Sequence, residues 1–327
     1  MKLLKNTRKK VVSLAVASAF VGVAAMSAPA LAANVAQDGK GEVLLFPYYT
    51  VKNGFDTIFS VVNTSDRTTL FKIRFREARN SREVRDFNVA LSPHDVWTGG
   101  VTISGADGAL VRTFDKSCTS PILPAGPNGS GQVGFTSLGY DGSDARYVYD
   151  NGGRNLSRVQ EGYFEIIEMA YSTVPESSIT SANTLEYATQ HVAGVPRNCV
   201  AFDQSFAPLN LADARWTSFT APANVLVGSS TLINVGSGKA FDASPTTIQS
   251  FRDVGTIIFE PGDLQPNLTD GDATVANFFV DGAPVVVTPT PVVVAASVEV
   301  VSALITANSV INAVSYTHLT LPTNREV

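Results

Sequence analysis

Two histidines, His94 and His191, are the candidate general bases of this chain. Hydrolysis by acyl transfer needs a nucleophile, a base and a third group that orients the base. The sequence has no Gly-x-Ser-x-Gly segment that would place a nucleophile. His94 stands in a Ser-Pro-His-Asp segment that is typical of a turn at a strand end, and His191 ends a possible helix. We therefore expect structural histidines and no catalytic residues, with a secreted hydrolase as the least favoured function.

Paired carboxylates are the second chemistry to consider, since glycoside hydrolysis needs two of them across one bond. Glu161, Glu165 and Glu168 surround one expected strand. Glu165 and Glu168 are separated by an odd number of residues, so they should face opposite sides of that strand. We expect exposed strand charges here and no acid pair.

Oxygen-rich loops make calcium the most plausible ion for this protein. One loop (GDLQPNLTDGDAT) holds Asp263, Asp270 and Asp272, and a second group comprises Asp141, Asp144 and Asp150. Calcium takes six to eight oxygen ligands, but neither loop has the spacing of an EF-hand. Calcium is therefore a weak candidate, ordinary Asp-rich turns are the alternative, and no other cofactor is expected.

A basic stretch lies within an otherwise acidic chain, whose net charge is −5. It comprises Arg74, Arg76, Arg79, Arg82 and Arg85. These residues could contact an acidic patch of a neighbouring subunit or an anionic glycan, although a solvated strand face is the favoured interpretation. Because the net charge is negative, the protein lacks the excess of basic residues that nucleic-acid binding requires, and no nucleic-acid partner is expected.

The two cysteines, Cys118 and Cys199, predict one disulfide in an oxidising compartment. Two free buried thiols are the alternative. A metal site is less favoured, because no histidine lies near either cysteine in sequence.

The strands that the sequence predicts must position all of these residues. Short β-branched and aromatic runs recur at roughly ten-residue spacing from residue 42 onward, which is typical of a β-sandwich. In the segment 70–76, Phe71, Ile73 and Phe75 alternate with basic residues, which predicts a half-buried strand. Later strands are expected near 162–169, 217–219, 224–234 and 254–259. The fold class is therefore all-β, of the immunoglobulin-like or β-sandwich type.

The β-sandwich region spans residues 33–283, as one large domain or two small ones. Gly, Asn, Asp and Ser crowd residues 121–158, which predicts a long loop excursion. A helix is expected over 181–191. Residues 284–296 form a Pro/Val connector or edge strand, and residues 297–313 have the spacing of a minor amphipathic helix near the C-terminal end.

The first 32 residues have the order of a secretory signal peptide. A cationic start precedes an apolar run over 11–26 and an Ala-Leu-Ala site. The run is shorter than the roughly twenty residues that a transmembrane span needs, so no transmembrane anchor is expected. We expect export to the periplasm, the outer surface or the extracellular space.

Residues 314–327 resemble a translated sequencing adapter. The segment VSYTHLTLPT matches the translation of a transposase-type adapter. We therefore treat this tail as non-native, exclude it from the fold, do not count His318 as a functional histidine, and expect a natural chain truncated near residue 312.

Several segments resemble a group of exported, β-rich proteobacterial proteins. They are VLLFPYYTV (43–51), VVNTSD (61–66), RFREARNSREVRDFNVALSPHDVWTG (74–99), EGYFEIIEM (161–169) and VGTIIFEPGDLQP (254–266). Residues 56–76 also resemble, more loosely, immunoglobulin-like surface and pilus-associated domains. The resemblance implies no particular activity. We expect a non-catalytic envelope or cell-surface protein, structural or adhesive, that self-associates or contacts other envelope proteins, with a carbohydrate- or calcium-binding module as the alternative.

Overall fold

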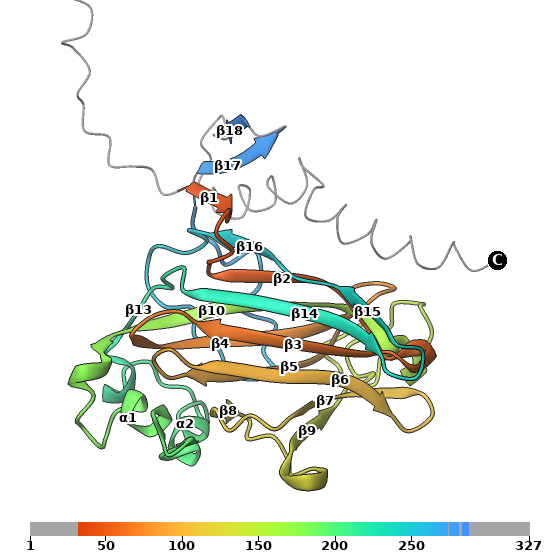
Figure 1. Ribbon diagram of the computed structural model, residues 1–327, viewed down its shortest axis with the longest axis horizontal. Coiled ribbons are helices and arrows are strands. Elements are labelled where there is room, and N and C mark those ends of the chain that lie inside the picture. Colours follow the sequence, from red (N-terminus) through yellow and green to blue (C-terminus); the bar gives the residue numbers. More distant parts are fainter. Residues whose placement is uncertain (1–31, 274, 281–282, 288–327) are drawn as a thin grey trace, which may run out of the picture. The chain divides into compact units, whose positions relative to one another are not determined.

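The computed structural model describes residues 32–273, 275–280 and 283–287 of the chain, which form two large sheets and short helices (Figure 1). The expected signal segment up to residue 31, the connector from residue 288, the amphipathic helix over 297–313 and the tail over 314–327 lie outside the described residues.

The larger sheet has ten strands among the described residues. In spatial order they are β18 (Ala283–Val287), β17 (Val275–Val280), β1 (Ala32–Val35), β16 (Thr246–Gln249), β2 (Val43–Thr50), β10 (Glu161–Pro175), β4 (Arg67–Glu77), β5 (Glu83–Leu91) and β8 (Thr119–Ser120), with β13 (Phe219–Thr220) also paired to β10. β1 and β17 run parallel, and the other pairs are antiparallel.

The smaller sheet has six antiparallel strands within the same residues. In spatial order they are β15 (Lys239–Asp242), β14 (Leu226–Asn234), β3 (Asp56–Asn63), β6 (Val96–Ser104), β7 (Gly108–Thr113) and β9 (Gly131–Gly134). A separate two-stranded ribbon joins β11 (His191–Val192) to β12 (Val195–Pro196).

The helices are short. They are α1 (Leu185–Thr189), α2 (Cys199–Gln204) and the 3-10 turns η1 (Lys52–Gly54), η2 (Pro127–Gly129), η3 (Leu156–Gln160), η4 (Glu176–Ser178) and η5 (Ala214–Trp216). None of the helices in the described part of the chain has the length and apolar character needed to span a membrane.

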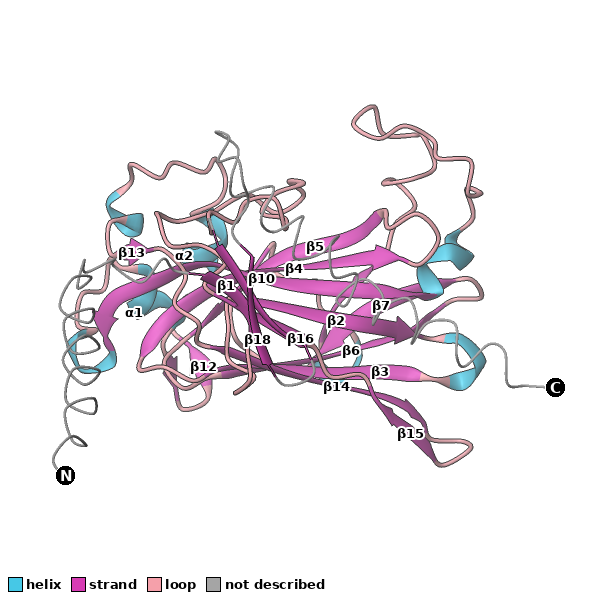
Figure 2. Ribbon diagram, turned by 90° about the horizontal axis from the view of Figure 1, so that it is seen from above, coloured by secondary structure: helices cyan, strands magenta, loops and turns pink. Residues whose placement is uncertain are grey.

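The two sheets lie face to face (Figure 2). Buried side chains from both sheets, many of them aromatic, form one hydrophobic cluster. Phe46 and Phe164 of the larger sheet stack at 4.1 Å between ring centroids. Phe59 of β3 lies 4.7 Å from Phe164 and 5.4 Å from Trp97 of β6. These rings are fully buried, and each buries roughly 150–250 Å² of surface. The predicted all-β sandwich is therefore confirmed.

A second hydrophobic cluster covers the other face of the ten-stranded sheet. The cluster combines strand residues such as Leu70 and Ile167 with Phe202, Trp216 and Phe251, which lie outside the long strands of the two sheets. The expectation of a half-buried β4 is consequently wrong, because this covering layer excludes water from the second face of the strand.

Local structure departs from the predicted elements at three places. Residues 254–259 were expected to form a strand, but they belong to the covering layer, where Ile257 donates its N–H to the Met169 carbonyl (2.9 Å). The helix expected over 181–191 is α1 alone, which begins after a Thr184 cap that accepts from Tyr187 N–H (3.3 Å). The expected connector begins within β18.

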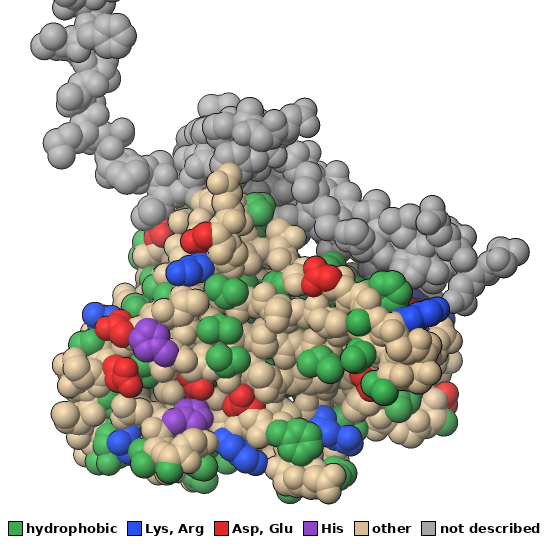
Figure 3. Space-filling model, in the orientation of Figure 1, with side chains coloured by type: hydrophobic (Ala, Val, Ile, Leu, Met, Phe, Trp, Pro, Cys, Tyr) green, Lys and Arg blue, Asp and Glu red, His purple; other side chains and the backbone are tan. Residues whose placement is uncertain are grey.

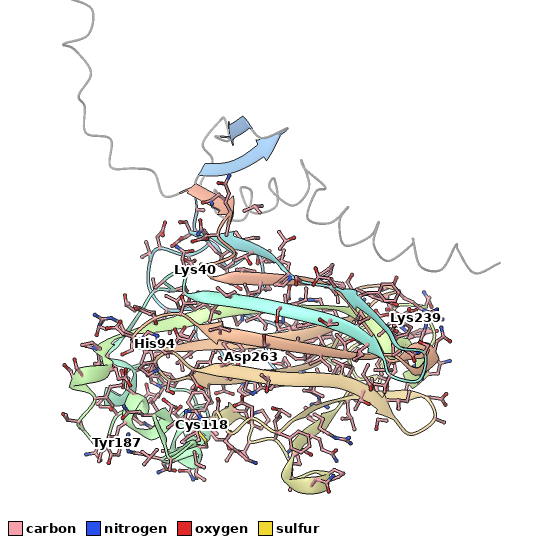
Figure 4. The ribbon with its side chains drawn as sticks, in the orientation of Figure 1. Lys40, His94, Cys118, Tyr187, Lys239 and Asp263 are labelled. Carbon is pink, nitrogen blue, oxygen red and sulfur yellow. A yellow bond between two sulfur atoms is a disulfide. The ribbon has the colours of Figure 1, made fainter. Side chains whose placement is uncertain are left out.

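Cys118 and Cys199 form the predicted disulfide. It joins the segment before β8, at the edge of the larger sheet, to the first residue of α2 in the covering layer (Figure 4). The bond closes a loop across a sequence separation of 81 residues, and it therefore ties the covering layer to the sheet that it covers.

Candidate functional site

Ser92, Asp95 and His191 come together at one end of the sandwich. Ser92 and Asp95 belong to the turn between β5 and β6, and His191 begins β11. His191 Nδ1 lies 3.0 Å from Ser92 Oγ and 3.2 Å from Asp95 Oδ2. The same carboxylate oxygen accepts from the Ser92 N–H (3.2 Å), the Ser92 hydroxyl (3.1 Å) and the Ser117 hydroxyl (3.3 Å).

This arrangement differs from a catalytic triad in the use of the imidazole. In a triad one ring nitrogen takes the serine proton while the other donates to the carboxylate. Here Nδ1 of His191 faces both partners, and the Ser92 hydroxyl donates to Asp95 directly. Ser92 is also buried, with 5% exposure. The cluster therefore holds the β5–β6 turn against β11, and its geometry differs from that of a catalytic triad.

His94 does not join this cluster. It is exposed, and its backbone has a positive φ of 56°, a conformation found mainly in turns. Its N–H donates to the Ser65 carbonyl at 2.9 Å. Figure 4 places it at the same end of the six-stranded sheet. The structure thus places His94 in the expected strand-end turn.

The acidic residues considered for calcium are held by donors of the protein itself. Asp270 accepts from Asn267 N–H (2.7 Å) and the Gln265 amide (2.8 Å), and Asp272 accepts from the Asp253 and Val254 amides (2.8 and 2.9 Å). The other group is similar: Asp141 binds Ser137 and Ser143, Asp144 binds Arg146, and Asp150 binds Arg158. Across the described ranges, no three His, Cys, Asp or Glu side chains are grouped as a metal site requires.

The loop around Asp263 instead surrounds a lysine. Lys72 of β4 is fully buried, and its ammonium donates to the carbonyls of Glu260 (2.7 Å), Asp263 (3.2 Å) and Gln265 (2.7 Å). Asp86 completes the shell at 3.3 Å. Burial lowers the pKa of Lys72, and Asp86 opposes that shift. An internal cation therefore occupies the centre of the oxygen-rich loop.

The basic stretch is likewise paired within the chain. Arg74 is 1% exposed and contacts Glu83 (2.6 Å), Glu165 (3.3 Å) and the Pro266 carbonyl (2.7 Å). Arg76 pairs with Glu165 at 3.0 Å. The remaining members are Arg79 on the Gly152 carbonyl, Arg82 near Asp150 and Arg85 on the Gly134 carbonyl. The favoured solvated strand face is wrong for Arg74, because residues 260–266 cover it.

Glu165 and Glu168 are buried rather than exposed, which corrects the expectation of solvated strand charges. Glu161 is half-buried and binds Lys52 and the Tyr48 hydroxyl (3.0 Å). Burial raises the pKa of Glu168 to about 8, although Thr69 Oγ1 (2.7 Å) and Ala223 N–H (3.1 Å) lie against its carboxyl.

Glu42, which sequence reasoning missed, is a second buried carboxyl. Burial raises its pKa to about 9, and the neighbouring Glu168 adds to the shift. Arg252 donates its backbone N–H to Glu42 at 2.7 Å. Burial therefore favours the neutral form of both acids. Each holds a loop by its backbone: Glu42 binds Arg252, and Glu168, in the middle of β10, binds Ala223.

The outward face of the six-stranded sheet is open to solvent, in contrast to the larger sheet. The strand registers place its residues in rows: Val227–Val62–Val96, Ser229–Ser60–Thr98 and Thr231–Ile58–Gly100–Arg112. Most of these side chains are small and uncharged. Figure 3 shows hydrophobic and other uncharged side chains over the middle of this face. We call it the outward face.

A shallow hollow lies on the outward face over Gly100. Asp56, Ile58, Thr98, Thr102, Arg112 and Phe114 line it together with the backbone of Gly99 and Gly100. Sequence reasoning missed this feature. The signal was the glycine pair inside an expected strand, which often marks a close approach of backbone to a ligand or another chain.

Comparison of the chain with protein-family models, curated proteins and solved structures finds no match.

Proposed function

We propose that the protein is an exported, non-catalytic envelope or cell-surface protein with a structural or adhesive role. The observation that carries this proposal is the contrast between the sheets. One sheet is covered on both faces, whereas the other presents an open and largely uncharged outward face. Sheet faces and edges of this kind are common contact surfaces between proteins.

Two further observations support the proposal. The disulfide is typical of proteins that fold in oxidising compartments. Strand β15, at the edge of the six-stranded sheet, is exposed along its whole length, and its Phe241 is 53% exposed. An exposed strand edge offers unpaired backbone groups to another chain. Contacts with further copies or with other envelope proteins are the interactions that this surface favours.

The proposal is tested on the purified mature protein. Sedimentation velocity and negative-stain microscopy over a range of concentrations should detect oligomers or filaments, and adhesion to cell-envelope preparations should be measurable. A protein that stays strictly monomeric at high concentration and adheres to nothing would count against this role. Labelling of Ser92 by a fluorophosphonate probe would favour the hydrolase hypothesis instead.

A further inference from the structure

We propose that the hollow over Gly100 binds the ring of a neutral sugar. This inference rests on the proposed adhesive role of the outward face and names the chemical class of its partner. Four features carry it: the origin of the hollow, its apolar walls, its unpaired polar groups and the balance of their charges.

The hollow exists because one side chain is missing from a regular row. Gly100 pairs with Ile58 of β3 on one side and with Arg112 of β7 on the other. The fold does not require glycine here. A Cβ on Gly100 would have the Thr57 carbonyl oxygen, at 3.5 Å, as its nearest neighbour, which is an ordinary contact. A glycine inside a strand weakens it, so this one is better explained by the space that it leaves.

The walls of the hollow are apolar and exposed. The Phe114 side chain is 60% exposed and Ile58 is 51% exposed, and both line the hollow. Binding sites for small molecules are concave and mainly apolar, with a few polar groups that fix the ligand. A pyranose ring has an apolar face of C–H groups that can cover an aromatic ring and remove it from water.

Two polar groups of the hollow have bonding capacity to spare. Arg112 lines the hollow and donates through Nη2 to Gln132 Oε1 at 3.3 Å, and its Nη1 has no hydrogen-bond partner among the described residues. No donor from the described residues reaches the Asp56 carboxylate. A sugar hydroxyl both accepts and donates, so it can accept from Arg112 and donate to Asp56.

The opposite charges of Arg112 and Asp56 disfavour a ligand that carries a single charge. An acidic sugar or a phosphate would gain from the guanidinium but would meet the Asp56 carboxylate in the same hollow. An ammonium group would gain from the Asp56 carboxylate but would be repelled by the Arg112 guanidinium. A neutral hexose pairs with both groups without repulsion, and we therefore assign it as the occupant.

Titration of the protein with methyl glycosides of glucose, galactose, mannose and N-acetylglucosamine, followed by two-dimensional NMR, tests the inference. We expect at least one neutral glycoside to shift the amide signals of β6 and β7, with a dissociation constant on the order of 1 mM for a single ring in an open site. Glucuronic acid should bind more weakly than the neutral sugar.

Two substitutions should remove binding through independent changes. Gly100→Thr fills the hollow and restores a residue that strands favour, and Phe114→Ala removes its aromatic wall without touching the core. Each should weaken binding at least tenfold. Phe241→Ala is the matched control, because it removes another exposed ring from the same sheet outside the hollow, and it should bind as the wild type does. Because Phe114 is exposed, its variant stays informative if Gly100→Thr folds poorly.

The inference is overturned if no neutral glycoside binds, or if Gly100→Thr and Phe114→Ala bind like the wild type. A distinct outcome is that Gly100→Thr abolishes self-association in sedimentation while sugars have no effect. The hollow would then be a contact between copies, and the proposed structural role would stand without the sugar site.

Discussion

Lys72 is a charged side chain without contact to water, and the loop that surrounds it explains how it is tolerated. Transfer of an ammonium ion into a protein interior costs several kcal/mol unless hydrogen bonds and an opposite charge offset it. Three carbonyls and Asp86 supply these contacts. The ammonium in turn donates to three carbonyls that would otherwise be buried without a hydrogen-bond donor. The lysine and its loop therefore depend on each other.

Lys72→Met should therefore be strongly destabilising. The substitution keeps the length of the side chain but leaves Asp86 and three carbonyls without their cation, and removal of one partner from a buried pair costs about 3–5 kcal/mol. Urea denaturation at pH 7 measures the loss. Lys239→Met is the control, because Lys239 is exposed on β15, and its stability should change by less than about 0.5 kcal/mol. Equal stability of the two variants would contradict the proposed dependence of the loop on Lys72.

Glu42 and Glu168 should make the folded protein less stable as the pH rises, which is the reverse of the usual effect of carboxyl groups. Burial raises their pKa values to about 9 and about 8, whereas both ionise near 4.5 when unfolded. Between these limits the folded protein holds protons that the unfolded chain has lost. Stability from this source is complete below about pH 4.5 and falls as pH rises towards 9.

Urea denaturation at pH 5, 7 and 9 measures this slope. Glu168→Gln should flatten it, because the amide mimics the protonated acid: its NH₂ can donate to Thr69 Oγ1 while its oxygen accepts from Ala223 N–H. At pH 5 the variant should lie within about 1 kcal/mol of the wild type. A profile for the variant as steep as that of the wild type would place the pH dependence elsewhere.

At the scale of the strand, residue alternation predicts which elements form but not which faces are covered. Phe71, Ile73 and Phe75 alternate as expected, yet Lys72 and Arg74 on the other side are also buried. Their cover comes from residues more than a hundred positions later in the chain, which a local pattern does not contain. The meeting of Ser92 with His191 is long-range in the same way. The sandwich was therefore predictable from the sequence, whereas the site contacts were not.

Neighbouring glycines in β6 serve different purposes, and substitution separates them. A Cβ on Gly99 would lie 2.6 Å from the Trp97 ring, whereas one on Gly100 has room. Gly99→Ala should thus cost about 1–3 kcal/mol through overpacking, and Gly100→Ala should leave stability unchanged or raise it by about 0.5–1 kcal/mol. Thermal unfolding of the two variants provides the comparison, and equal midpoints would refute the distinction.

For the molecule as a whole, the disulfide stabilises the covering layer. In the chain-entropy model, closing a loop of this length lowers the free energy of the folded state relative to the unfolded one by roughly 4.5 kcal/mol. Cys118→Ser combined with Cys199→Ser should lose about 2–5 kcal/mol in urea denaturation. Dithiothreitol should destabilise the wild type by a similar amount and leave the double variant unaffected. An effect of the reductant on the double variant would show that another process is being measured.

The Cys118–Cys199 bond also limits how far the protein can be stretched. The closed loop contains β10, the strand between β2 and β4 in the larger sheet. Tension applied to the two ends passes through the sulfur atoms, so the closed loop, which spans a sequence separation of 81 residues, withholds about 280 Å of contour length. In the proposed adhesive role, a molecule under shear would lengthen without unravelling its central strand. Optical tweezers should record that extra length only after reduction.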